Sequence, residues 1–183
     1  TEDGDVIGNI TRVIDFNCNV NNPTTLPMYH QFVLGLDSVK VADLIDDLPS
    51  FGFPDSDNPD FFFPSIAQWN SVSGEDSIPS GMNDFLKSNE CVHLLLPANQ
   101  RYTLEYSGTL PKENYPVLVP GAPSLAFVGN PTNGNLKMGS IQEAMGNDLR
   151  GVACWNPLTI QYDIYTKGVS TNGLNGLLQP TRV

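Results

Sequence analysis

Residues 158–165 read LTIQYDIY, and residues 101–107 read RYTLEYS. In both stretches apolar and polar side chains alternate, which is typical of a β-strand with one buried face and one solvated face. The residues expected on the buried faces are Leu158, Ile160, Tyr162 and Ile164 in the first stretch and Tyr102, Leu104 and Tyr106 in the second. These two strands are the clearest signs of a β-rich fold.

Turn residues cut the rest of the chain into short pieces. Fifteen Pro and sixteen Gly leave room for short strands but for no helix longer than about three turns. Content of β-branched and aromatic residues indicates further strands at residues 10–20, 28–36, 91–96, 117–119 and 124–128. With about seven strands, we predict an all-β fold: an antiparallel β-sandwich forming one domain over residues 1–183.

Short helices are expected to interrupt the strands. In residues 39–48 the apolar side chains share one helical face, and they are Val41, Leu44, Ile45 and Leu48. A second helix is expected at residues 82–87, and a third is expected to begin at Ser140, which has capping-box spacing to Glu143. Residues 49–79 are predicted to be mainly loop. Their aromatic stretch, residues 61–69, is either an exposed anchor for a partner or, more commonly, loop packing.

Charge excludes two classes of partner. Nine Lys and Arg stand against twenty Asp and Glu, giving a net charge of −11, and the bases are scattered. Nucleic-acid binding needs several bases on one face, so we expect no direct nucleic-acid contact. The apolar runs are too short to span a bilayer, so we expect no membrane insertion.

Signals for catalysis are weak. The histidines, His30 and His93, both lie in expected strands, and no G-x-S-x-G elbow is present. We interpret each as a partly buried strand residue with one hydrogen bond. Glu105 is the best single carboxylate for a hydrolase, but an acid on the solvated face of a strand is the ordinary alternative. We therefore expect that the chain is not an enzyme.

Metal and disulfide signals are also sparse. The three cysteines, Cys18, Cys91 and Cys154, are far apart and odd in number, so we expect three buried, reduced thiols. Neither the spacing of a zinc site nor a nucleotide-binding glycine loop is present, and no cofactor is expected with certainty.

One segment is strongly acidic: residues 41–86 contain nine acids and no Lys or Arg. Within it, Asp55, Asp57 and Asp60 supply hard oxygen ligands close together, the chemistry that Ca²⁺ prefers. A solvated loop is the simpler alternative, and a calcium site here would need further ligands from a second subunit. We also expect these like charges to raise one another's pKa.

The order of elements carries a resemblance. Helical inserts at residues 39–48 and 82–87 follow early strands, and the final strand LTIQYDIY comes after residues 123–129, PSLAFVG. In this order the chain resembles the jelly-roll coat-protein domain of small non-enveloped icosahedral RNA viruses. The resemblance implies a virion shell or projection domain that self-assembles with other capsid subunits and offers outer loops to a host receptor. It also implies Ca²⁺ held between subunits by Asp55, Asp57 and Asp60.

The chain departs from that family in charge, because coat proteins that package RNA usually carry a basic arm. It begins at Thr1 without Met, so we expect a fragment or a processed product. Two alternatives stay open. One is an extracellular carbohydrate-binding or adhesin β-sandwich whose Tyr and Trp side chains stack on a glycan. The other is a small hydrolase that uses Glu105.

Overall fold

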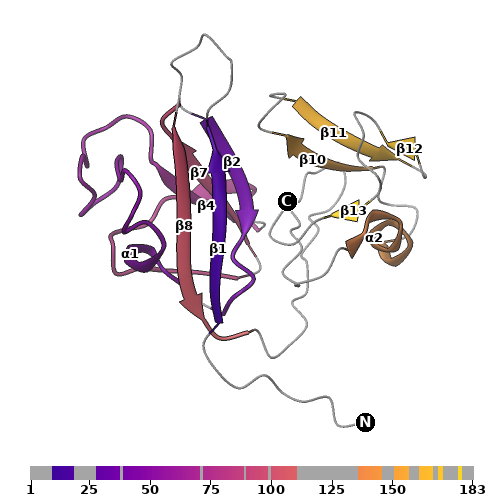
Figure 1. The fold of residues 1–183 in the computed structure, drawn as a ribbon, viewed down its shortest axis with the longest axis horizontal. Coiled ribbons are helices and arrows are strands. Elements are labelled where there is room, and N and C mark those ends of the chain that lie inside the picture. The colour runs from indigo at the N-terminus through magenta and orange to yellow at the C-terminus, as the bar shows by residue number, and fades with distance from the viewer. Residues whose placement is uncertain are drawn as a thin grey trace.

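The computed structural model describes residues 10–18, 28–37, 39–70, 72–88, 90–98, 100–110, 136–145, 151–156, 161–166, 169–170 and 177–178. Strands dominate these residues, and each pairing between the named strands is antiparallel (Figure 1). The prediction of an all-β, antiparallel fold is confirmed. No helix in these ranges has the length and hydrophobicity needed to cross a bilayer.

The strands form five small sheets. The first pairs β1 (Ile10–Asn17) with β8 (Arg101–Gly108), and the second has the order β2 (Met28–Val33), β7 (Cys91–Leu96), β4 (Ile66–Asn70), β5 (Glu75–Ser77). A short pair joins β3 (Val39–Lys40) to β6 (Phe85–Leu86). The C-terminal part has β10 (Val152–Asn156), β11 (Gln161–Thr166) and β12 (Val169–Ser170) in one sheet, and β9 (Leu136–Lys137) with β13 (Leu177–Leu178) in another.

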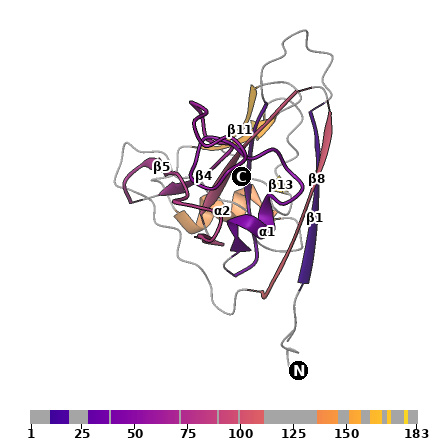
Figure 2. The same cartoon turned by 90° about the vertical axis from the view of Figure 1, so that its left-hand side faces the viewer.

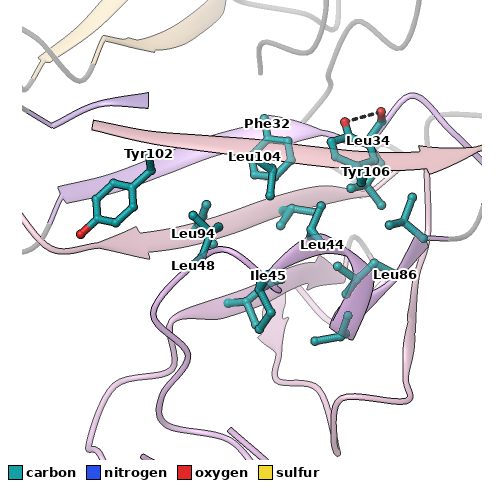
Figure 3. Packing of buried hydrophobic residues seen from close by; sticks show 14 of the residues in the cluster. Phe32, Leu34, Leu44, Ile45, Leu48, Leu86, Leu94, Tyr102, Leu104 and Tyr106 are labelled. Carbon is teal, nitrogen blue, oxygen red and sulfur yellow. Dashed lines mark hydrogen bonds between the residues drawn. The ribbon is translucent and has the colours of Figure 1, made fainter. Parts of the chain in front are cut away.

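The main core lies between the first two sheets, which Figure 2 shows with β1 and β8 on one side and β4 and β5 on the other. Along β8 the alternation is as predicted: Tyr102, Leu104 and Tyr106 are buried, and Thr103, Glu105 and Ser107 are exposed. The four-stranded sheet contributes Phe32, Ile66, Val92, Leu94 and Leu96 from its inner face. The two sheets also meet through a hydrogen bond, since the Tyr106 hydroxyl donates to the Leu34 carbonyl at 2.8 Å (Figure 3).

The first helical prediction is right in its buried face and too long in its extent. Residues 39–48 contain β3 and then α1 (Val41–Leu44), a single turn. All four residues of the predicted face, Val41, Leu44, Ile45 and Leu48, are buried in the core. Figure 3 shows Leu44, Ile45 and Leu48 on the side of the core opposite Tyr102 and Leu104 of β8.

The helix predicted at residues 82–87 is wrong. A turn is followed by β6, which pairs with β3, and the backbone N–H groups of Val41 and Ala42 donate to the carbonyls of Asp84 and Met82. Pairing with the neighbouring segment therefore satisfies this backbone in place of a helical ladder.

Residues 49–79 are mainly loop, as predicted, but they also contain two strands that were not predicted, β4 and β5. Gln68 lies on the inner, core-facing side of β4 and is buried. Its side-chain amide donates to the Lys87 carbonyl at 2.7 Å and accepts from the Lys87 N–H at 3.0 Å. A polar residue is thus accommodated in the core because both of its amide groups are paired.

In the C-terminal part, α2 (Met138–Met145) is present as a helix but begins two residues before Ser140, which lies inside it. The predicted buried face of the last strand is wrong: Tyr162 and Ile164 are exposed on β11. Tyr165 instead packs with Ile141 and Val152 against buried Cys154. The strands predicted at residues 117–119 and 124–128 lie outside the described residues, as do residues 157–160.

Candidate functional site

The most unusual surface of the described chain is the loop of residues 50–65, which Figure 1 shows projecting in violet beside α1. Its two ends are joined at a neck: the Phe51 N–H donates to the Ser65 hydroxyl at 3.0 Å, and the Ser65 N–H donates to the Phe51 carbonyl at 2.7 Å. The Ser65 carbonyl in turn accepts from Leu95 of β7 at 2.7 Å. The loop is therefore anchored on the four-stranded sheet.

Inside the loop, Asp57 organises the first turn. Its carboxylate accepts from the Ser50 N–H at 3.2 Å and from the Ser50 hydroxyl at 2.7 Å, while its own N–H donates to that hydroxyl at 3.0 Å. Hydrogen bonds from Ser50 hold the pKa of Asp57 below its usual value, because they stabilise the charged form. The expectation that like charges raise the pKa is wrong for this residue: the hydrogen bonds from Ser50 lower the pKa by more than desolvation raises it.

One aromatic side chain anchors the loop and three are displayed by it. Phe53 is fully buried in the core, whereas Phe61, Phe62 and Phe63 are 45%, 86% and 57% exposed. Phe61 rests edge-on against Phe51 at 4.9 Å, and the rings of Phe62 and Phe63 meet at 4.7 Å and 86°. We call Phe61, Phe62 and Phe63 the phenylalanine triplet. The sequence left two interpretations of residues 61–69, exposure and loop packing. Exposure is correct for the triplet, whereas Ile66 in β4 packs in the core.

The acids predicted as calcium ligands all precede the triplet in sequence and do not form one group. Asp55, Asp57 and Asp60 are all exposed, and Asp55 adopts a left-handed backbone with φ 64°. Among the described residues no three His, Cys, Asp or Glu side chains come together in a way that could hold a metal. Calcium binding by these residues stays a prediction, and ligands from a second chain would be required.

A second candidate site lies on the outer face of the four-stranded sheet. The register places Gln31, His93 and Ala67 side by side on neighbouring strands, and Asp76 opposite Trp69 on the edge strand β5. The Asp76 carboxylate lies 2.9 Å from Nδ1 of His93. With Nδ1 protonated towards Asp76, Nε2 is left to accept from the Gln31 amide at 3.5 Å.

Aromatic rings flank this histidine. The ring centroid of Tyr29 lies 5.4 Å from that of His93, and the ring centroid of Trp69 lies 6.3 Å from it. Tyr29 is 39% exposed, and burial together with Asp76 raises its pKa to about 12. The face therefore combines an accessible phenol, a carboxylate and an amide around a fixed imidazole, groups suited to recognising a polar ligand.

His30 lies on the opposite, inner face of the same sheet. Its Nε2 is 3.3 Å from Sγ of Cys18, and its ring packs 4.8 Å from Phe16. Burial lowers the pKa of His30 to about 4 and raises the pKa of Cys18 to about 11. A nucleophilic pair needs the thiolate, so these shifts oppose catalysis by this pair. The interpretation of His30 as a buried strand residue agrees with the structure, and His93 has two side-chain partners instead of one.

The remaining predicted side chains are placed separately. Glu105 is exposed on the outer face of β8, opposite Val13, while the neighbouring Tyr102 and Tyr106 point into the core. Because Cβ direction alternates along a strand, these tyrosines cannot assist Glu105. Cys18, Cys91 and Cys154 are buried and form no disulfide, as expected.

Sequence reasoning missed the His93 and Asp76 pair because β5 was not predicted. No pattern in the sequence marks this pair, because the contact depends on the register of β7, β4 and β5. Comparison of the chain with protein families, with curated proteins and with solved structures gives no match.

Proposed function

We propose that this chain is a structural virion domain that acts by associating with other subunits, and that its two facing sheets belong to a single jelly-roll sandwich. The observation that carries the association is the phenylalanine triplet on its anchored loop. Large apolar groups held in solvent mark interaction surfaces, because burying them in a contact is favourable. A loop already fixed by hydrogen bonds loses little entropy when it docks.

Charge determines which geometry of contact is favourable. Two copies of the same loop would bring Asp55, Asp57 and Asp60 against their own counterparts, so a loop-to-loop contact is repelled. A heterologous contact, in which the loop docks on a different surface of its neighbour, avoids this repulsion and can close into rings or shells. Host-receptor binding by outer loops belongs to the same proposal, as does a virion location.

Association is tested by sedimentation velocity over a range of protein concentrations, with electron microscopy for particles. Phe62→Ser should weaken self-association at least tenfold, since it removes the most exposed ring of the triplet. Val72→Ser is the matched control, because Val72 is also highly exposed but lies in a different turn. A chain that stays monomeric throughout, or that associates equally well with Phe62→Ser, would contradict the proposal.

The outer face of the four-stranded sheet favours a second function, glycan binding by an extracellular sandwich. Tyr29 can stack on a sugar face, and Asp76 and Gln31 can pair with its hydroxyl groups. Glycan-array binding lost in Tyr29→Ala but kept in Tyr162→Ala would support this function, because both tyrosines are exposed. Equal binding by both variants, or no glycan bound by the parent chain, would reject it.

A further inference from the structure

We propose that the phenylalanine triplet, together with the carboxylates beside it, docks an arginine-bearing segment of a partner subunit. This inference rests on the proposed association and names the chemistry of the contact. It follows from the exposure of the rings, the local charge and the rigidity of the loop that carries both.

The rings offer open faces. Phe62 and Phe63 meet edge to face at 86°, so each covers little of the other, and Phe62 is 86% exposed. A cation placed over a phenylalanine face is attracted by the ring quadrupole, and arginine is the commoner partner because its flat guanidinium also stacks.

The surrounding charge selects the same side chain. Residues 41–86 contain nine acids and no base, and Asp60 directly precedes the triplet. Asp60 is exposed, so its carboxylate is accessible to a guanidinium that stacks on Phe61 or Phe62. Asp57, by contrast, already accepts from Ser50 and acts mainly in shaping the loop.

The loop holds these groups in fixed relation. The Phe61 N–H and the Gly52 N–H both donate to the Asn58 carbonyl, at 3.3 Å and 2.9 Å, which ties the start of the triplet to the neck. Aliphatic partners would use the rings without the acids, and a lysine would pair with the acids without stacking well. Arginine uses both features of the surface at once.

The test uses three probe peptides of equal length, each with three variable positions separated by glycine. These positions hold arginine in the first peptide, lysine in the second and citrulline, the neutral isostere of arginine, in the third. Binding is measured by calorimetry at physiological salt. We expect the arginine peptide to bind at least fivefold more tightly than the lysine peptide, and the citrulline peptide to show no binding. Phe62→Ser and Asp60→Asn should each weaken arginine binding at least fivefold.

Glu105→Gln is the matched control, because Glu105 is an exposed acid on the outer face of β8, away from the loop. Equal affinity for arginine and lysine, or an equal loss in Glu105→Gln and Asp60→Asn, would show only general attraction to an acidic chain and would overturn the inference. Self-association that depends on Phe62 without arginine preference would reject this inference while the proposed function stands. Arginine preference in a chain that never associates would reject the proposed function alone.

Discussion

At the scale of single residues, the two histidines show how one sheet separates two environments. His30 and His93 lie on adjacent strands but point to opposite faces, His30 into the core beside Cys18 and His93 towards Asp76. Desolvation without a counter-charge keeps His30 neutral, with a pKa of about 4. Protonation of His30 should therefore change the free energy of unfolding as the pH is lowered.

Stability should fall as the pH is lowered from about 6.5 towards 4. The folded-state pKa of His30 lies below its unfolded value, so the unfolded chain binds the extra proton in this window and folding becomes less favourable. At about 1.4 kcal/mol per pKa unit, we expect about 2 kcal/mol of unfolding free energy to be lost between pH 7 and pH 4.5. Urea unfolding at both pH values measures it.

His30→Gln is the comparison, because it removes the titrating group while keeping a polar side chain. Its unfolding free energy should change much less over the same interval. Asp57 does not affect this comparison. Because its pKa is lowered in the folded chain, the stability that its carboxylate contributes is lost mainly below about pH 4, the ordinary pKa of a carboxyl group. A parent chain and a His30→Gln variant with identical pH dependence would contradict the assignment.

The cysteines give a second prediction at this scale. Burial raises the pKa of Cys18 to about 11 and raises that of Cys91 further, and all three cysteines are buried and in no disulfide. A thiol reagent at pH 8 should therefore label no cysteine quickly in the folded chain and three after denaturation. Fewer than three on denaturation would reveal a disulfide, and fast labelling of the folded chain would contradict the burial.

At the scale of elements, Gly52 allows the loop to close. It has φ +78°, and a Cβ added there would run into the backbone of Phe63 and Pro64. Gly74 has a similar φ of +73° but has open space around the same position. Comparing alanine substitutions at Gly52 and Gly74 therefore distinguishes the cost of backbone strain, which both positions share, from the cost of a steric clash, which only Gly52 has.

We expect Gly74→Ala to cost about 1 kcal/mol of unfolding free energy, the strain of a left-handed alanine. Gly52→Ala should cost about 1–2 kcal/mol more or should displace the phenylalanine triplet, since the neck between Phe51 and Ser65 has to open. Denaturant unfolding of both variants measures the difference. Equal costs would show that the neck is not rigid.

The sequence predicted elements well where alternation and burial coincide. In β8 every second residue faces the core, and the prediction holds residue by residue. It failed at β5, because Glu75, Asp76 and Ser77 are all exposed and show no apolar residue to mark a strand. A strand held only by pairing with β4 leaves no hydrophobic pattern.

Alternation also fails to say which face is covered. In β11 the pattern identified two faces correctly, but Ile141 of α2 packs on the face with Tyr165, and Tyr162 and Ile164 on the other face are exposed. The candidate sites share this limit. The triplet was visible as a cluster of rings, but its exposure depends on the neck of the loop, and the His93 and Asp76 pair depends on the register of three strands.

At the scale of the whole molecule, a net charge of −11 opposes assembly. Exposed charges interact over about 8 Å at physiological ionic strength, so subunits in contact repel wherever acidic side chains of both lie within this distance. A partner arginine offsets this repulsion, and so does a divalent cation shared between subunits. The two means of neutralisation predict different responses to calcium.

If loop aspartates share Ca²⁺ between subunits, calcium should stabilise the associated form and leave the monomer unchanged. The reason is structural: among the described residues, Asp55, Asp57 and Asp60 belong to no cluster of three His, Cys, Asp or Glu side chains that could hold a metal. A ligand bound only by the assembled state stabilises that state by about 2.7 kcal/mol at a hundredfold excess over its dissociation constant. Millimolar Ca²⁺ should then raise the melting temperature at protein concentrations where the chain associates.

Asp55→Asn/Asp60→Asn should abolish the calcium effect, and Asp57 is kept because its carboxylate shapes the loop through Ser50. The matched control is Glu105→Gln/Glu143→Gln, which removes two exposed acids elsewhere and should keep the effect. An equal response to Mg²⁺ would indicate general screening, since Mg²⁺ seldom accepts an all-protein oxygen cage. If Ca²⁺ changes neither melting nor association, the calcium prediction is wrong and these acids bind no metal.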